Sequence, residues 1–216
     1  MIKAFIFDLD GVVVDTVGYH FDSWIKLAHS LGFKLNDDIK EKLKGINRMT
    51  SLDIVLAHGG ITASQAEKIE YAKQKNDWYL ESIASMNDDI ILEGVKEFLI
   101  SAQKEKLKIA VGSASGNARK VLSKTSIYSK FDTIKDSNDA KHSKPHPEVF
   151  LKAAEALSVD PSEAIIFEDS AKGVDAAKAG GFKCVGIGSA DILTDADIVM
   201  DNLNHITADI IVKLLS

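Results

Sequence analysis

The stretch FIFDLDGVVVDT, residues 5–16, begins as an apolar run typical of a buried strand and then places Asp8 and Asp10 one residue apart. Carboxylates near a core are costly unless something pairs with them. In extended backbone, alternate side chains project to one side, so the two carboxylates lie close together. Unit charges about 4 Å apart repel by roughly 4 kcal/mol at an effective dielectric near 20. The stretch therefore predicts a strand that ends at a cation-binding site.

Four further apolar runs resemble the first, and helical patterns separate them. The predicted strands are 2–7, 107–115, 164–169, 183–188 and 196–200, and the predicted helices of this part are 94–106, 117–127, 146–158 and 171–181. Strands that alternate with helices and are apolar on both faces are typical of parallel sheets between helical layers. We expect an α/β fold with a doubly wound parallel sheet.

Polar side chains follow three of these strands at the point where each strand ends. They are Asp8 and Asp10, then Ser113, then Glu168 and Asp169. Ligands of open α/β sheets bind beyond the carboxyl ends of the strands, so these groups are expected at one rim. Hard oxygen donors without thiolates favour Mg²⁺ over a soft metal. A single D-x-D could instead cap a turn, but four acids at one rim need a cation.

Residues 16–87 differ from the rest because no convincing strand interrupts their helical patterns. Apolar residues recur at helical spacing over 17–31, a short helix is expected over 36–45, and a long helix over 62–83 opens with Thr62 and Gln65 at capping-box spacing. We predict a helical cap domain over residues 16–87, inserted into a core domain made of residues 1–15 and 88–216.

Composition excludes several classes of protein. The 216 residues are 45% apolar, enough for a sizeable core, and the net charge of −6 comes without a basic cluster, so nucleic acid is not an expected partner. The single cysteine, Cys184, precludes an internal disulfide. No apolar run approaches the roughly 20 residues of a membrane span, and no secretory signal is recognisable. We expect a cytoplasmic monomer that does not contact a membrane.

Lys144 lies in SKPHPEVF, residues 143–150, in a loop made rigid by proline, where its ammonium could balance the acids and an incoming phosphate. Ser113 adds a hydroxyl and nearby main-chain N–H donors. DLDGV, Ser113, Lys144 before proline, and EDSAKG at 168–173 occur in the order typical of the haloacid dehalogenase-like superfamily of phosphotransferases, which the chain resembles over its whole length. The predicted cap resembles the small cap of that superfamily.

The resemblance extends to LKGINRMTS at 43–51, KQKN at 73–76 and SASGN at 113–117. These segments resemble the superfamily's mutases that interconvert beta-glucose 1-phosphate and glucose 6-phosphate through beta-glucose 1,6-bisphosphate. The resemblance implies Asp8 as the nucleophile that becomes phosphorylated, Asp10 as general acid and base, and Ser113 and Lys144 as holders of the transferring phosphoryl group. It also implies one Mg²⁺ per chain, bound by Asp8, the main-chain carbonyl of Asp10, Glu168 and Asp169.

The same resemblance implies a set of substrate-binding residues from both domains. Besides Asp10, Ser113 and Lys144 they are Thr16, His20, Trp24, Gly45, Ile46, Arg48, Ser51, Lys75, Ala114, Ser115 and Asn117. Arg48, Ser115 and Asn117 are expected to hold the distal phosphate of the sugar.

Three positions of the predicted site need further comment. The family pattern has a lysine where this chain has Gly116, so we expect weaker binding of the distal phosphate or an altered substrate range. Trp24 is equally compatible with core packing and with substrate contact. His20, near the hinge, is expected to set Asp10 through a hydrogen bond.

Two other functions remain compatible with the residues. A sugar-phosphate phosphatase on the same scaffold would keep Asp8, Asp10, Lys144 and Asp169 but pass the phosphoryl group to water. A non-catalytic sugar-phosphate sensor would have little reason to keep a nucleophile beside a general acid. A dehalogenase is not favoured, because its chemistry does not need this magnesium-binding set of acids. In all the phosphate-dependent interpretations, the partner is a small sugar phosphate.

Overall fold

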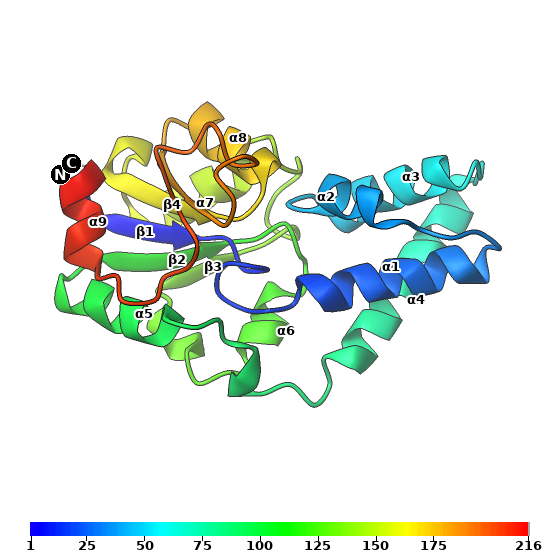
Figure 1. Cartoon of the computed structure of the whole chain (residues 1–216), viewed down its shortest axis with the longest axis horizontal. Helices are drawn as coiled ribbons and strands as arrows, with labels where there is room; N and C mark the ends of the chain where they lie inside the picture. The colour runs from blue at the N-terminus through cyan, green and yellow to red at the C-terminus, as the bar shows by residue number, and fades with distance from the viewer. Residues whose placement is uncertain (216) are drawn as a thin grey trace.

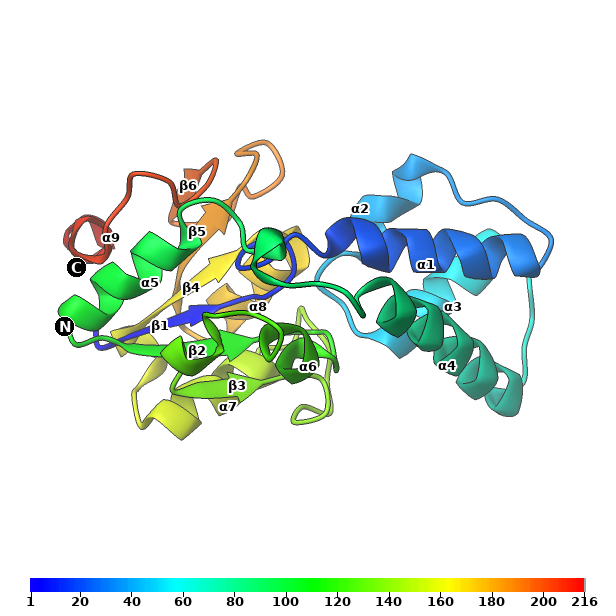
Figure 2. The same cartoon turned by 90° about the horizontal axis from the view of Figure 1, so that it is seen from below.

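A computed structural model describes residues 1–215, and a six-stranded parallel sheet forms its centre. The strand order is β3-β2-β1-β4-β5-β6 (Figures 1 and 2). The strands are β1 Ala4–Phe7, β2 Lys108–Gly112, β3 Thr133–Lys135, β4 Ala164–Glu168, β5 Lys183–Ile187 and β6 Ile198–Met200. This arrangement confirms the predicted fold class.

Helices cover both faces of the sheet, because successive residues of β1 are all apolar and point to opposite faces. Phe5 and Phe7 of β1 pack with Phe98 on one face, while Ala4 and Ile6 pack with Phe150 on the other. The helices of this core are α5 Val95–Lys104, α6 Ala118–Leu122, α7 Glu148–Leu157, α8 Ala171–Ala179 and α9 Ala208–Leu215. The two apolar layers hold the sheet rigid, and its strand ends therefore form a fixed platform.

The five predicted strands are all present, each with shorter bounds than predicted. β3 was missed because only its central residue, Ile134, is apolar, whereas the equally short edge strand β6 is apolar throughout. The final helix, α9, was also missed. Ser216, the last residue of the predicted core domain, lies outside the described residues.

A second helical body extends from the core beside the strand ends (Figures 1 and 2). Its helices are α1 Val17–Ser30, α2 Lys40–Leu43, α3 Arg48–His58 and α4 Gln65–Ser82, and a 3-10 turn, Asp37–Ile39, precedes α2. Trp24, Leu27, Leu52, Val55 and Leu56 form its own apolar cluster. We call this body the cap and propose residues 16–87 as its bounds.

Two details of the cap differ from prediction. The segment 48–58, expected only as a motif, forms helix α3, whose N-cap Asn47 accepts a hydrogen bond from the Thr50 N–H. The capping box of α4 is Ser64 with Glu67, not Thr62 with Gln65. The prediction was wrong by two residues because the Glu67 carboxylate lies 2.7 Å from the Ser64 N–H, and a carboxylate is a strong acceptor for the free N–H groups of a helix start.

Replacing Ser64 by alanine should lower the free energy of unfolding by about 1 kcal/mol, because the Glu67 N–H loses its acceptor. Urea unfolding followed by circular dichroism measures the change. Thr62→Ala is the matched control, since Thr62 is exposed and lies outside the observed box. Equal effects of the two substitutions would contradict the assignment.

Within residues 1–215, no helix combines the length and the apolar character that crossing a membrane requires.

Candidate active site

The ends of β1, β2 and β4 meet at one edge of the sheet, as the parallel order demands. Phe7 pairs with Val111 on one side and with Phe167 on the other. The next residue, Asp8, donates its N–H to the Phe167 carbonyl at 2.8 Å. Asp8 and Glu168 therefore lie at the same level of adjacent strands, Ser113 lies one residue beyond that level after β2, and all three are buried.

Lys144 reaches this edge from the loop between β3 and α7. Its ammonium lies 2.5 Å from a carboxylate oxygen of Asp8 and 2.5 Å from one of Glu168. The side chain is fully buried and its Nζ lies 4.4 Å from the centre of the Phe150 ring. A buried, doubly paired ammonium is fixed in place, which is what a group that holds a phosphoryl oxygen requires.

The acids at this edge outnumber the cations. Burial raises the pKa of Asp8 to about 7, the charges of Glu168 and Asp10 add to that rise, and Lys144 opposes it. Burial, together with Glu168 and Asp8, holds the pKa of Asp169 well above its ordinary value. The pKa of Lys144 is raised by the two carboxylates, although burial opposes this. One ammonium thus serves several carboxylates, and the site is short of positive charge.

A divalent cation fits this deficit and the oxygen chemistry of the donors. The carboxylates of Asp8 and Asp169 both line the pocket beyond the strand ends. No group of three His, Cys, Asp or Glu side chains suited to a metal occurs in residues 1–215, so main-chain and substrate oxygens would have to complete the coordination. This agrees with the main-chain role predicted for Asp10, which stays a prediction.

Glu168 makes different contacts from those expected of a metal ligand. One of its oxygens accepts from Lys144, and the other accepts from the N–H and hydroxyl of Ser170 at 2.8 and 2.9 Å. A Cβ at Gly173 would lie 1.8 Å from the Glu168 carboxylate, so only glycine fits at this position in the first turn of α8. Direct metal binding by Glu168 stays a prediction, and its observed partner is Lys144.

Asp10 lies at the hinge between core and cap. Its carboxylate accepts a hydrogen bond from the Thr16 hydroxyl and lies 3.5 Å from Nε2 of His20. Burial disfavours the ionised form, yet His20, Thr16 and Lys75 together bring the pKa of Asp10 below its ordinary value. The structure brings His20 close to Asp10 as the sequence predicted, but Nε2 makes no hydrogen bond within the described residues, so the predicted hydrogen bond stays a prediction.

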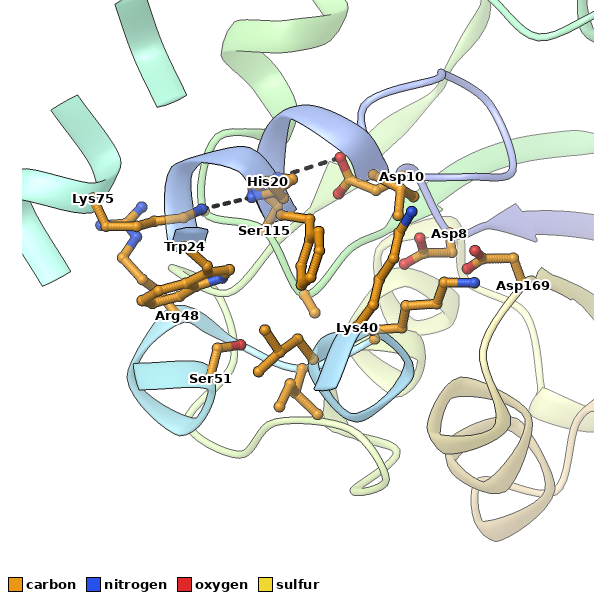
Figure 3. Close-up of a pocket in the computed structure, with 18 residues that line it drawn as sticks. Asp8, Asp10, His20, Trp24, Lys40, Arg48, Ser51, Lys75, Ser115 and Asp169 are labelled. Carbon is orange, nitrogen blue, oxygen red and sulfur yellow. Dashed lines mark hydrogen bonds and ion pairs between the residues drawn. The ribbon is translucent and has the colours of Figure 1, made fainter. Parts of the chain in front are cut away.

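His20 connects Asp10 to a lysine of the cap. The Lys75 ammonium lies 2.9 Å from Nδ1 of His20, and the Tyr79 ring stacks on the imidazole at 3.9 Å. Burial and the nearby Arg48 lower the pKa of Lys75 to about 7. A Lys75 ammonium can only donate, so when Lys75 is protonated the imidazole proton lies on Nε2, on the side of Asp10. Figure 3 shows this line of three side chains.

A pocket lies between these core residues and the cap (Figure 3). Twelve predicted site residues line it: Asp8, Asp10, His20, Trp24, Gly45, Ile46, Arg48, Ser51, Lys75, Ala114, Ser115 and Asp169. Trp24 packs in the cap cluster and also lines the pocket, so its contact with a substrate stays a prediction. Side chains from all four cap helices and from three strand ends line this one space.

Five predicted residues lie behind the pocket wall instead of in it. Thr16, Ser113, Lys144 and Glu168 are buried among the core residues, and the Asn117 side-chain amide donates to the side-chain oxygen of Asn76 in α4 at 2.9 Å. For Thr16 and Glu168, this placement suits groups that position Asp10 and Lys144. Asn117, expected at the distal phosphate, here joins core to cap.

The sequence missed five residues that line the pocket. They are Val17, Phe21, Lys40, Leu43 and Lys44. Lys44 lies inside the motif at 43–51, and Lys40 lies one helical turn before Lys44. Helical spacing therefore places both lysines on one face of the segment, and this could have indicated them as pocket residues. Which face of this short helix turns inward depends on the docking of the cap, which no local pattern reveals.

The cap is docked on the core through direct contacts. The Asn47 N–H donates to the Ser143 hydroxyl at 2.8 Å, and Lys172 donates to the Lys42 carbonyl at 2.6 Å. Gly45 has a φ of +68°, and a Cβ there would lie 2.2 Å from the Ser170 hydroxyl oxygen. Glycine thus permits both the turn and the close approach of cap to core.

Comparisons with known proteins agree with this geometry. Residues 2–181 match the model of the haloacid dehalogenase-like hydrolase family. The chain is 36% identical over 211 residues to the beta-phosphoglucomutase of Bacillus subtilis, covering 97% of this chain and 93% of that protein. It is 28% identical over 183 residues to a phosphorylated carbohydrates phosphatase of Thermotoga maritima, covering 84% and 82% of the two chains.

A solved structure resembles both the core and the cap. The crystal structure of beta-phosphoglucomutase from Clostridium difficile matches with a TM-score of 0.96 at 40% identity, over 100% of this chain and 97% of that one. The similarity includes the helical insertion as well as the sheet. The chain therefore belongs to the haloacid dehalogenase-like hydrolase family.

Proposed function

We propose that the protein is a beta-phosphoglucomutase that interconverts beta-glucose 1-phosphate and glucose 6-phosphate through beta-glucose 1,6-bisphosphate. The observation that carries the proposal is a single pocket with the Asp8–Asp10 pair on the core side and Arg48 and Lys75 on the cap side. Such a pocket suits a ligand with phosphate at either end. Relatives that share both the core and the cap bear this name.

Asp8 is the proposed nucleophile. Its carboxylate carries the phosphoryl group as an acyl phosphate and passes it to the 6-hydroxyl of beta-glucose 1-phosphate. The product, the 1,6-bisphosphate, turns over in the site, and the carboxylate then attacks the phosphorus at C1. Lys144 stabilises the charge that spreads over the phosphoryl oxygens in each transition state.

Asp10 is the proposed general acid and base. It takes the proton from the 6-hydroxyl when that oxygen attacks the acyl phosphate, and it gives a proton to the C1 oxygen when that oxygen leaves. Thr16 and His20 hold the carboxylate in place. Since His20 touches both Asp10 and Lys75, docking of the cap positions the proton shuttle as it closes the pocket.

Mg²⁺, bound by the Asp8 and Asp169 carboxylates and the Asp10 carbonyl, would supply positive charge that lowers the repulsion between nucleophile and phosphate. We assign Glu168 to holding Lys144 through their ion pair. We propose a cytoplasmic monomer for which small sugar phosphates are the ligands.

A sugar-phosphate phosphatase is the competing function, since a Thermotoga maritima relative is named a phosphatase of phosphorylated carbohydrates. Three hydrogen bonds dock the cap over the pocket. We propose that the docked cap limits the access of water to the acyl phosphate, which favours transfer to a sugar.

The proposal is tested by supplying beta-glucose 1-phosphate, Mg²⁺ and a trace of the 1,6-bisphosphate, with glucose 6-phosphate read by a coupled dehydrogenase and free phosphate measured in parallel. We expect glucose 6-phosphate as the main product, and no turnover in excess chelator until Mg²⁺ is restored. Free phosphate as the main product would support the phosphatase. Turnover of the alpha anomer alone, or full activity in chelator, would contradict the proposal.

Asp10→Ala should slow both half-reactions by about 10²- to 10⁴-fold, because each requires a proton transfer at a sugar oxygen. Single-turnover rates of Asp8 phosphorylation by the bisphosphate and of transfer to beta-glucose 1-phosphate measure the two steps. Asp22→Ala, an exposed acid on α1, is the control and should leave both rates unchanged. Near-normal rates for Asp10→Ala would show that another group moves the proton.

A further inference from the structure

Lys40 is a cation of the pocket that neither the sequence pattern nor the proposed mechanism uses. It opens the short helix α2, is half-buried, and lines the same space as Asp8 and Asp10. Figure 3 shows its side chain extending from the cap into the pocket, toward the side where the aspartates lie.

Within residues 1–215, the ammonium of Lys40 has no carboxylate within 4 Å. Its only described contact is the Phe21 ring, whose centre lies 5.6 Å away. The neighbouring pocket lysines are different, because Lys44 pairs with Glu41 at 2.9 Å and Lys75 contacts His20 at 2.9 Å. The Phe21 ring attracts the Lys40 ammonium but does not neutralise its charge, so the positive charge stays available to a ligand.

The core wall of the pocket lacks a cation at Gly116. A Cβ there would lie 3.0 Å from the Ser137 hydroxyl oxygen and 3.2 Å from the Asn138 side chain, so a larger residue would crowd its neighbours. The Asn138 side chain is itself fixed, because its amide donates to Asp136 and to the Gly116 carbonyl. Further positive charge for the ligand must therefore come from the cap.

We propose that Lys40 is a phosphate-binding residue of the docked cap, which supplies to sugar phosphates the positive charge that Gly116 does not. The inference rests on the proposed function, since a phosphate ester carrying a charge of about −1.5 to −2 is the ligand that this cation recognises. The docked position of α2 brings the charge over the pocket, because Lys172 holds the Lys42 carbonyl. Binding of the phosphate would in turn stabilise the docked cap.

The test is titration calorimetry with glucose 6-phosphate in the absence of bisphosphate, so that the unphosphorylated enzyme binds without turnover. Lys40→Met keeps the aliphatic packing on Phe21 and removes the charge, and we expect its dissociation constant to rise about tenfold or more. Lys42→Met is the matched control, an exposed lysine of the same helix outside the pocket, and should change the constant less than about twofold. Lys40→Arg should restore most of the affinity.

Equal affinities of the Lys40→Met and Lys42→Met proteins, at equal melting temperatures, would overturn the inference. A loss of affinity that Lys40→Arg fails to restore would also overturn it, since the role would then be packing. A wild-type protein that binds no glucose 6-phosphate leaves Lys40 without its ligand and likewise overturns it. The coupled assay decides the proposed reaction separately: if phosphate is the main product while binding still depends on Lys40, the mutase proposal fails and the role of Lys40 stands.

Discussion

Asp8→Asn should reduce turnover by about 10⁴-fold or more, because an amide oxygen cannot act as the nucleophile that the carboxylate provides. The substitution keeps the size and shape of the side chain, so the buried site should stay folded. Incubation with phosphate-labelled bisphosphate, followed by acid quench and peptide mapping, should give a labelled acyl phosphate on Asp8 in the wild type and none in the variant.

Turnover and binding measured together in Asp8→Asn separate the enzyme from a sensor. We expect Asp8→Asn to retain binding, because the cap residues that line the pocket are unchanged. A sensor would keep its full response in this variant, whereas the proposed enzyme loses turnover and keeps only binding. A variant that retains both turnover and a labelled residue other than Asp8 would show that the nucleophile was assigned wrongly.

Lys144→Met should have the second large effect, and it should act on both stability and rate. The ammonium is buried against two carboxylates, and removing one partner of such a group costs about 3–5 kcal/mol of folding free energy. The loss of one fixed cation at the phosphoryl group should lower kcat by about 10²- to 10³-fold. Urea unfolding and the coupled assay measure the two effects.

A double-mutant cycle that combines Lys144→Met with Glu168→Gln tests whether the two side chains stabilise the fold as one network. If Lys144 and Glu168 form one network, removing the Glu168 charge as well should recover part of the lost stability, since fewer unpaired charges stay buried. Activity should not recover in the double variant, because the cation is still missing. Additive losses in stability would show that the two side chains act independently.

The sequence by itself determined the alternation of strands and helices, and with it the parallel sheet. Apolar runs such as 164–169 are long enough to show that a strand is buried on both faces, and parallel order then places Asp8, Ser113 and Asp169 at one edge. The acids of the site and Ser113 could be predicted in this way, because they follow directly from where strands end, whereas the cap residues came from the resemblance to the family. The edge strand β3 could not be predicted, since only its central residue is apolar.

Only the tertiary structure decided which groups face the pocket and which stand behind it. Lys144 and Glu168 are far apart in sequence from Asp8, yet they share one buried network, and this network rather than a motif gives Glu168 its partner. Likewise, Lys40 comes to line the pocket and Asn117 gains its contact with Asn76 only where the cap meets the core. Local sequence determines the backbone conformation of each segment. The face that a cap helix turns toward the pocket depends instead on long-range packing between the cap and the core, and no single segment contains that information.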